Sequence, residues 1–436
     1  MSIPVVTVGP SQEAVVEGLE RLQGPVTVVR RCEELTELIA ACQSGLAVAA
    51  VVAEGSGELT TTLVDRLGAV GVMIVALTDD PVEMARLHSI GVVAAASGIE
   101  PAALASTISE AVGRDQSRGR LGSGLHAGFS DAGADPLPAP VADIAEDWSK
   151  NPGKIYAVWG PVGAPGRTLL AVNMAAELAA DGQSVILVDA DSYGASVAAA
   201  LGLLDESAGL ALACRLADQG LLDVKALEGA AIQVFTKRGS FRVLTGTTRA
   251  DRWTELRAAA LSAVLEQARQ IADVIVVDVG FCLEADEELS FDSMAPRRNA
   301  ATLRSLELAD VVFAVGTADA IGVPRLVRGL AELEAVVPQV SARVVLNKVR
   351  RAAAGRSPRQ QLEDAWVRYG PGMGIDAYLP ADPAACDAAL LSGSVLLEVA
   401  PDSELRMAIA GLVCAPVQQN RNSFGRTTRA LGLHKR

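Results

Sequence analysis

The chain has 436 residues, more than one typical hydrophobic core holds, so two or more domains are expected. Its 38 lysines and arginines face 52 aspartates and glutamates, a formal net charge of −14, which opposes non-specific binding to nucleic acid. No apolar run approaches the roughly 20 residues that span a bilayer, and the first residues lack the pattern of a signal peptide. The six cysteines are scattered without a C-x-x-C pair, which disfavours a zinc or disulfide framework. These features predict a cytoplasmic protein with reduced, mostly buried thiols.

The first 113 residues alternate short β-branched runs with amphipathic helical segments. The runs PVVTVG, VTVVRRC, AVAAVVAEG, VMIVALTDD and VVAAAS are separated by segments such as EAVVEGLERL and ELTELIAAC. This alternation is typical of a parallel sheet with helices on both faces. Five strands and about five helices predict a flavodoxin-like domain over residues 1–113.

Two segments lack such periodicity. Residues 114–150 are rich in Gly, Pro, Ser and Asp and predict a flexible linker. The C-terminal tail, predicted over residues 416–436, ends in RNSFGRTTRALGLHKR, which is basic and contains no acid. A weak contact of this tail with an acidic membrane surface is one interpretation. A frayed, solubilising terminus is the favoured one.

Residues 151–415 resume the α/β alternation more strongly. Strands are predicted in KIYAVWG, SVILVDADS, FRVLTG, DVIVVDVG, DVVFAVGTAD, ARVVLNKV and GIDAYLP. The helix TLLAVNMAAELAADG follows the first of these strands and ends at Gly182. The pattern predicts a second α/β domain with a mostly parallel, doubly wound sheet.

The segment GPVGAPGRT, residues 160–168, approximates a phosphate-binding loop, G-x-x-x-x-G-K-[ST]. Gly163 and Gly166 allow backbone N–H groups to converge on a phosphate at the start of a helix. Thr168 stands where the loop's hydroxyl would bind Mg²⁺, whereas Pro161 replaces the first Gly and Arg167 the Lys. Arginine is a planar fork and lysine a compact point charge, so the replacement is not equivalent. Taken alone, the segment fits an ordinary Gly/Pro turn equally well.

Three acids follow apolar strands in the order that a nucleotide site requires. Asp189 and Asp191 end the run VILVDAD, and Asp278 ends DVIVVDVG. Strand ends in doubly wound sheets converge on the ligand, and a carboxylate at such an end organises Mg²⁺ in P-loop enzymes. Together with the loop, these acids predict a site for a nucleotide and Mg²⁺.

From Lys154 to about Leu412 the chain resembles the MinD/ParA class of P-loop ATPases, whose deviant loop reads K-G-G-x-G-K-[ST]. Further matching segments are VVLNKV, with Asn347 where the class reads adenine, and the ending YLPADPAACDAALLSGSVL. The resemblance implies ATP and Mg²⁺ as cofactors and a homodimer as the assembly. It also implies site roles: catalysis by Asp191 and Arg167; a metal held by Thr168, Asp189 and Asp278; and nucleotide contacts from Gly163, Ala164, Pro165, Gly166, Arg167, Thr168, Leu169, Asn347, Pro380 and Asp382.

The chain departs from this class at one position that matters for turnover. Val162 stands where the signature lysine of the class reaches the partner's phosphate, and valine cannot do so. Binding with slow hydrolysis is therefore expected. After the third acidic strand, Arg297 and Arg298 fall in the segment that corresponds to switch II of the class. Sensing a phosphate or a partner, and merely starting a solvated helix, are equally good interpretations of these two arginines.

The N-terminal domain resembles a response-regulator receiver that has lost its chemistry. Its first strand is not followed by an acidic pair, and Ala53 or Glu54 stands where the phosphorylated aspartate would be. Ser97 replaces the receiver lysine, and only Thr78 matches, at the switch hydroxyl. Without a nucleophile, phosphoryl transfer is not expected. The resemblance implies a pseudo-receiver used for docking.

A pseudo-receiver joined to a deviant ATPase is the layout of the CpaE/TadZ proteins. The resemblance implies a weakly hydrolysing ATP-binding protein that positions or assembles a Flp-type pilus. Pilus secretion and assembly proteins or a polar landmark are the implied partners, with recruitment to the inner face of the membrane at a pole or septum. A MinD-type regulator of the division site is the alternative. A DNA-partitioning protein is disfavoured by the acidic charge, and a small-molecule kinase or synthetase by the lack of a second substrate site.

Overall fold

The computed structural model describes residues 2–9, 13–22, 24–121, 152–203, 208–285 and 297–414. Residues 122–150 of the predicted linker and the basic tail lie outside this part of the chain. None of the described helices is long and apolar enough to span a bilayer. All six cysteines are described and none is in a disulfide; three are buried, namely Cys32, Cys42 and Cys214.

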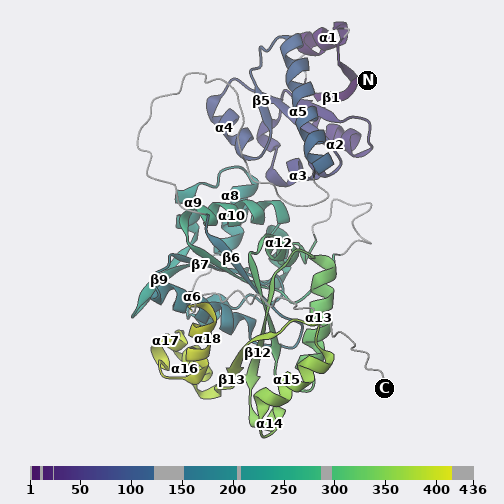
Figure 1. Ribbon diagram of the computed structural model, residues 1–436. Helices are drawn as coiled ribbons and strands as arrows, with labels where there is room; N and C mark the ends of the chain where they lie inside the picture. The colour runs from purple at the N-terminus through teal and green to yellow at the C-terminus, as the bar shows by residue number, and fades with distance from the viewer. Residues whose placement is uncertain are drawn as a thin grey trace, which may run out of the picture.

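The N-terminal unit, residues 3–121, is built on a five-stranded parallel sheet (Figure 1). The strand order is β2-β1-β3-β4-β5, which is the order of flavodoxin-like sheets. Its elements are β1 (Ile3–Val8), α1 (Glu13–Arg21), β2 (Val26–Cys32), α2 (Leu35–Gln43), β3 (Ala49–Val52), η2 (Ser56–Glu58), α3 (Thr61–Ala69), β4 (Met73–Leu77), α4 (Pro81–Ser89), β5 (Val93–Ala95) and α5 (Pro101–Leu121).

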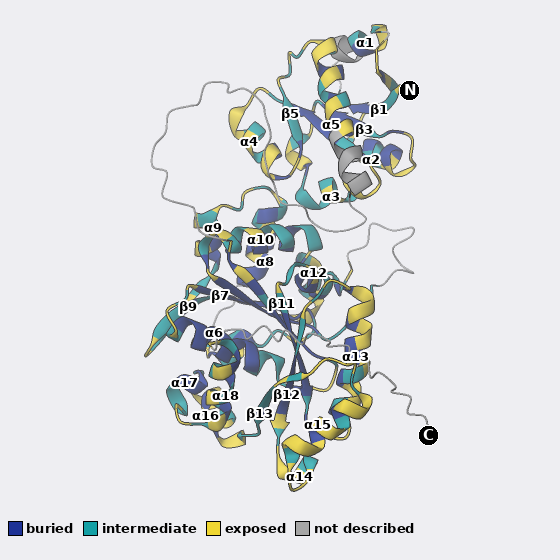
Figure 2. Cartoon of the chain, in the orientation of Figure 1, coloured by how far each residue is buried: buried dark blue, intermediate teal, exposed yellow. Residues whose placement is uncertain are grey.

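Hydrophobic side chains cover both faces of this sheet, as the alternation in the sequence predicts. All four residues of β3 are buried, and two separate apolar clusters form, one on each face (Figure 2). Helix α5 continues to Leu121, so eight residues of the predicted linker, 114–121, are helical. Extending a helix that has already formed costs little free energy, and each glycine in its interior costs only about 1 kcal/mol.

The C-terminal unit, residues 154–413, is built on an eight-stranded sheet in the order β13-β12-β11-β6-β10-β7-β9-β8. Seven strands run parallel, and β8 pairs antiparallel with β9 at one edge. Its elements are β6 (Lys154–Trp159), α6 (Arg167–Ala180), β7 (Val185–Ala190), α7 (Val197–Ala200), α8 (Gly209–Asp218), α9 (Val224–Ala230), β8 (Ile232–Thr236), β9 (Gly239–Leu244), η3 (Ala250–Glu255), α10 (Ala258–Ile271), β10 (Val274–Val279), α12 (Ala300–Leu308), β11 (Val311–Thr317), α13 (Gly322–Val336), β12 (Ala342–Val349), α14 (Arg351–Ala354), α15 (Pro358–Tyr369), β13 (Ile375–Pro380), α16 (Pro383–Ser392), α17 (Leu396–Val399) and α18 (Glu404–Val413).

Strand β8 is the element that the sequence analysis did not predict. Its residues alternate between half-buried and exposed, and a tight turn at residues 237–238 joins it to β9. A short edge strand with one exposed face has a weaker hydrophobic signal than the buried runs of the central strands. The predicted strands of this unit all form, and β6 and β10 lie at the centre of the sheet.

Helix α6, which follows the glycine-rich loop, is locked into the interior. Ten consecutive residues, Leu170–Ala179, are buried. Buried Asn173 donates to the backbone oxygen of Leu169 and accepts from the backbone N–H of Leu396, both at 2.8 Å. Buried Glu177 accepts two hydrogen bonds of 2.6 Å from the guanidinium of Arg406 on α18. Because each buried polar group has a partner, the helix and the loop before it are held in a fixed position.

Candidate nucleotide-binding site

Three neighbouring strands of the C-terminal unit end in the loop and the acids that the sequence singles out. Strand β10 pairs with both β6 and β7, and Asp278 lies in register with Val158 on one side and Asp189 on the other. The carboxyl ends of these strands face the start of α6. The glycine-rich loop, Asp189 and Asp278 therefore meet at one edge of the sheet, where doubly wound sheets bind ligands.

The loop before α6 is curled by three residues with positive φ. Gly163 has φ 119°, Ala164 φ 50° and Gly166 φ 99°. A side chain at Gly166 would overlap the amide nitrogen of Asn347, so this position requires glycine for space as well as for conformation. Successive backbone N–H groups in such a turn at a helix N-terminus form an anion-binding concavity.

Asp278 is the central carboxylate of the site. One of its oxygens, Oδ2, accepts a hydrogen bond of 2.6 Å from the hydroxyl of Thr168, the second residue of α6. The other oxygen, Oδ1, is buried and has no partner among the described residues. Burial, together with the nearby Asp189 carboxylate, raises the pKa of Asp278 well above its ordinary value. A hydroxyl beside an unpaired carboxylate oxygen is a donor set that suits Mg²⁺.

Asp189 differs from Asp278 in that the chain donates a hydrogen bond to each of its two oxygens. Oδ2 accepts from the backbone N–H of Val197 at 2.9 Å, and Oδ1 from that of Asp191 at 3.3 Å. Burial raises the pKa of Asp189 to about 6, although these backbone donors oppose the shift. Asp189 thus shapes the segment 191–197 around the site.

The described residues contain no group of three metal-ligating side chains that forms a ready cage. Mg²⁺ in phosphate-transfer sites takes only one or two protein ligands and completes its shell with phosphate oxygens and water. Thr168 and Asp278 fit this sparse coordination. The residues present are therefore compatible with Mg²⁺ bound together with a nucleotide.

The two predicted catalytic residues, Arg167 and Asp191, form an ion pair with each other. Nη2 of Arg167 lies 3.0 Å from Oδ2 of Asp191, and Nη1 donates to the backbone oxygen of Gly160 at 3.0 Å. Oδ1 of Asp191 accepts from the backbone N–H groups of Tyr193 and Gly194. With both carboxylate oxygens engaged, Asp191 is poorly placed to take a proton from an attacking water.

Asn347 and its neighbour clamp the loop from the other side. The amide of buried Asn347 donates to the backbone oxygen of Pro165 at 2.8 Å, and its oxygen accepts from the backbone N–H of Lys348. Lys348 has φ 59°, and its ammonium donates to the backbone oxygen of Ala164 at 2.9 Å. The sequence analysis overlooked Lys348. The signal available was a cation directly after Asn347.

A second cation missed from the sequence is Arg325 on α13. Its Nη1 lies 2.8 Å from where a side chain on Gly163 would begin. Val162, in contrast, is 55% exposed and points no charge at the loop. Arg325 and Lys348 therefore bring positive charge to the loop from helix α13 and strand β12. No spacing rule in the sequence places them there, because both depend on how α13 and β12 pack against β11, the strand next to β6.

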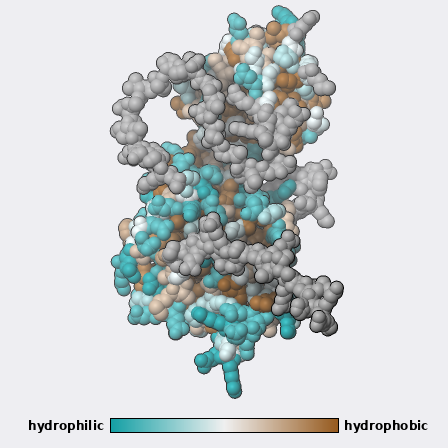
Figure 3. All heavy atoms as spheres, viewed as in Figure 1, coloured by the Kyte–Doolittle hydropathy of each residue, from teal (hydrophilic) through white to brown (hydrophobic). Residues whose placement is uncertain are grey.

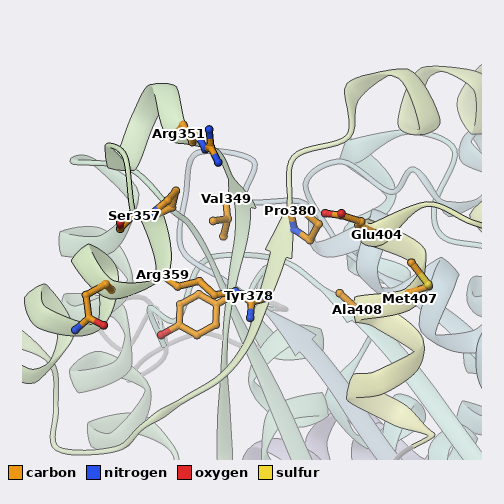
Figure 4. A pocket seen from close by; sticks show the side chains of 11 residues that line it. Val349, Arg351, Ser357, Arg359, Tyr378, Pro380, Glu404, Met407 and Ala408 are labelled. Atoms are coloured by element: carbon orange, nitrogen blue, oxygen red, sulfur yellow. The ribbon is translucent and has the colours of Figure 1, made fainter.

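Two predicted base contacts lie away from the loop. Pro380 ends β13 and lines a groove of about 960 Å³ together with Val349, Arg351 and Tyr378 (Figure 4). No lining residue of this groove belongs to the loop. Asp382 caps α16 by accepting from the backbone N–H of Ala385 at 3.0 Å and from the hydroxyl of Ser403 at 2.7 Å. The backbone hydrogen bond lowers the pKa of Asp382, which fits a structural cap.

The groove borders a basic surface that the overall acidic composition conceals. Five cations lie within twelve residues and are exposed: Lys348, Arg350, Arg351, Arg356 and Arg359. None of them forms an ion pair with a described residue. Figure 3 shows hydrophilic atoms at this end of the molecule, where α14 lies in Figure 1.

The two arginines after the third acidic strand occupy different environments. Arg297 is exposed. The guanidinium of Arg298 lies 4.0 Å from the centre of the Tyr193 ring and donates to the backbone oxygen of Ser192 at 3.4 Å. Arg298 thus contacts the segment that directly follows Asp191, which a simple solvated helix start would not do.

The raised pKa values of Asp278 and Asp189 predict a pH-dependent effect of Asp278→Asn. When the pKa of a carboxyl is higher in the folded than in the unfolded protein, the protein loses stability as the pH rises from the unfolded value, here about 3.8, through the raised folded value. The variant should therefore melt a few degrees above the unmodified protein at pH 8, with the excess shrinking toward pH 4. Calorimetry without nucleotide checks this, with exposed Asp251→Asn as control. A difference that does not depend on pH would contradict the raised pKa.

Comparison with known proteins finds similarity to solved structures. No protein-family model and no curated protein matches the chain. Among solved structures it is similar to the cell division ATPase MinD of Pyrococcus furiosus, with 19% identity, a TM-score of 0.46, and coverage of 60% of this chain and 97% of that one. It is also similar to a ParA family ATPase from Chlorobium tepidum TLS, with 20% identity, a TM-score of 0.48, and coverage of 60% and 98%. A third is the septum site-determining protein MinD complexed with Mg-ADP from Pyrococcus horikoshii OT3, with 17% identity, a TM-score of 0.46, and coverage of 60% and 94%.

Proposed function

We propose that the C-terminal unit binds ATP together with Mg²⁺ at the edge formed by β6, β7 and β10. The observation that carries the proposal is the bond between the Thr168 hydroxyl and Asp278, whose second oxygen is buried and has no partner in the described part of the chain. Burying an unpaired carboxylate oxygen is unfavourable, so its presence beside a curled glycine loop favours a site built for a cation and phosphate. The choice of ATP rests on the resemblance of the sequence to the MinD/ParA class.

Each residue has a distinct task in this site. Backbone N–H groups of residues 163–168 receive the phosphates at the N-terminus of α6. Thr168 and Asp278 hold Mg²⁺, which when bound neutralises charge on the phosphate oxygens. Asp189 holds the segment 191–197 in place through its two backbone hydrogen bonds.

We expect slow hydrolysis because the charged side chains at the loop are already bonded to other groups of the protein. Arg167 is tied to Asp191 and to the loop backbone, so neither side chain is free for the chemical step. Val162 supplies no charge in trans. We propose that the nucleotide is held for longer than turnover would require, and that binding is the output of this unit.

Removing the Thr168 hydroxyl or the Asp278 carboxylate should weaken nucleotide binding in the presence of Mg²⁺. We expect Thr168→Ala and Asp278→Ala each to lower the affinity for a fluorescent ATP analogue by tenfold or more, because a charge-assisted contact to the cation is lost, at about 1.4 kcal/mol per tenfold. Equilibrium titration of folded full-length protein gives the readout. Thr236→Ala, which removes a hydroxyl from the β8–β9 turn, is the matched control. Equal affinities in all four proteins would refute the site.

Turnover without a partner should be well below the roughly 1–1,000 s⁻¹ of typical enzymes. We expect Arg167→Lys to raise the rate several-fold, because lysine cannot hold Asp191 and the Gly160 carbonyl in one planar fork. Phosphate release at saturating ATP and Mg²⁺ measures this, with the exposed Arg249→Lys as control. A rate of about 10 s⁻¹ or more in the unmodified protein would contradict the role given to the ion pair.

We further propose that the N-terminal unit is a pseudo-receiver that docks rather than accepts phosphate. Gly9 follows β1, and Ala53 and Glu54 follow β3, so no aspartate stands at these two strand ends. The two aspartates after β4 are engaged by the backbone: Asp79 accepts from Ser97 at 3.0 Å, and Asp80 from Val82 at 2.9 Å. Together these observations favour a binding role.

The cellular role that best joins these properties is that of a positional or assembly factor for a Flp-type pilus. The proposed protein is a homodimer of the CpaE/TadZ kind, recruited to the inner face of the membrane at a pole or septum by pilus components or a landmark. A MinD-type division regulator is the alternative. The net charge of −14 disfavours a DNA-partitioning role.

A fluorescent fusion of the full chain should form a discrete focus at a pole or septum, because a binding output requires a fixed partner. Live-cell imaging and electron microscopy of a deletion strain test this together. Loss of pili on deletion separates the pilus role from the division role, which would instead give misplaced septa. Diffuse signal with normal pili and normal division would contradict both.

A further inference from the structure

The N-terminal unit contacts the C-terminal unit where two helix ends meet. Carbonyl groups at the C-terminal end of α8 accept hydrogen bonds from the N-terminal unit: Ala217 from the hydroxyl of Thr61 at 2.8 Å, and Gln219 from the guanidinium of Arg86 at 3.1 Å. The last carbonyls of a helix have no partner within it and carry partial negative charge. Arg86 on α4 therefore acts as a cationic cap for a helix of the other unit.

The second helix end is the start of α3 in the N-terminal unit, and a side chain of the C-terminal unit caps it. The carboxylate of Asp218 on α8 accepts from the backbone N–H of Thr62, in the first turn of α3, at 2.9 Å. Its other oxygen pairs with Arg257, which precedes α10, at 3.2 Å. An acid at the start of α3 and a cation at the end of α8 each match the local helix charge. The contact is thus complementary in both directions.

Gly220 fixes how closely the two units approach. It has φ +71°, and a side chain there would begin 2.7 Å from Ile90 and 3.0 Å from the hydroxyl of Ser89. The Ser89 hydroxyl also donates to the backbone oxygen of Gly220 at 3.2 Å. Figure 1 shows α3 lying directly above α8 and α10. Glycine is therefore required here both for the backbone conformation and for the contact.

The opposite end of α8 lies beside the candidate nucleotide site. The backbone N–H of Gly209 donates to the hydroxyl of Thr245, and that of Leu210 to the backbone oxygen of Thr245. The next residue, Gly246, is packed so closely on Asp189 that a side chain would begin 2.8 Å from its carboxyl carbon. Helix α8 has ten residues, about 15 Å in length, and its inner face is buried. Helix α8 is thus a short, well-packed element that connects the surroundings of Asp189 to the N-terminal unit.

We propose that α8 couples the nucleotide site to the contact between the N-terminal and C-terminal units. Arg86, Thr61 and Asp218 are the residues of this contact that carry the coupling. The inference rests on the proposed nucleotide binding. A change around Asp189 shifts Gly246 and Thr245 and with them the start of α8, and a shift of α8 alters the caps at its far end. By reciprocity, loosening those caps changes the affinity for nucleotide.

The experiment uses full-length protein and two measurements. Hydrogen exchange followed by mass spectrometry reports on residues 59–66 and 210–221, with and without Mg²⁺ and a non-hydrolysable ATP analogue. Titration of the same analogue gives its affinity in the unmodified protein, in Arg86→Ala, in the milder Thr61→Val, and in Arg21→Ala as control. Arg21 forms an exposed ion pair with Glu17 on the same unit, away from the contact.

We expect nucleotide to change exchange in both segments of the unmodified protein. Arg86→Ala should raise exchange at 210–221 and alter the affinity about fivefold or more, while Arg21→Ala does neither. Raised exchange with unchanged affinity in both interface variants would overturn the coupling but leave nucleotide binding intact. Unchanged exchange at 210–221 in both variants would overturn the docking itself. Absence of binding to the unmodified protein would overturn the proposed function as well, and the titration detects this directly.

Discussion

A buried carboxylate with one unpaired oxygen is the constraint on which the C-terminal unit depends. Asp278 lies on the central strand β10, between β6 and β7, and among the described residues only the Thr168 hydroxyl donates to its side chain. Keeping such a group buried is unfavourable, so the surrounding structure must hold it firmly. Helix α6 does so through the Glu177–Arg406 ion pair, which anchors it to α18.

The glycine-rich loop is held by three side chains from two other elements. Arg167 of α6 holds the loop backbone and Asp191, while Asn347 and Lys348 of β12 hold the carbonyls of Pro165 and Ala164. In this arrangement the positive charges of Arg167 and Lys348 are already used for structure. Such a loop is better suited to retaining a phosphate group than to rapid turnover, since a catalytic group must be free to move a proton.

The contact between the two units uses the backbone polarity of two helix ends. Side chains from across the boundary satisfy two carbonyls at the end of α8 and one N–H group at the start of α3. Contacts of this kind are specific in direction but modest in strength, because each hydrogen bond contributes only about 1 kcal/mol. A modest contact can respond to events at the nucleotide site, whereas a large apolar interface would hold the units in one arrangement.

The sequence by itself determined the two α/β sheets and the sheet edge that carries the candidate site. Buried parallel strands read as continuous apolar runs, and an acid or glycine at the end of such a run marks the edge that binds ligands. Edge strand β8 and the extension of α5 were not predicted, because half-exposed strands and helix ends give weak periodic signals in the sequence.

Only the tertiary structure decided what each polar group at that edge does. It paired Arg167 with Asp191, turned Asn347 and Lys348 onto the loop, and used Asp382 as a helix cap. It also brought Arg86 to the end of α8, 133 residues away in the chain. The local sequence determines which segments form helices and strands. The partner of a side chain depends instead on how segments that are distant in the chain pack together, and no local sequence pattern contains that information.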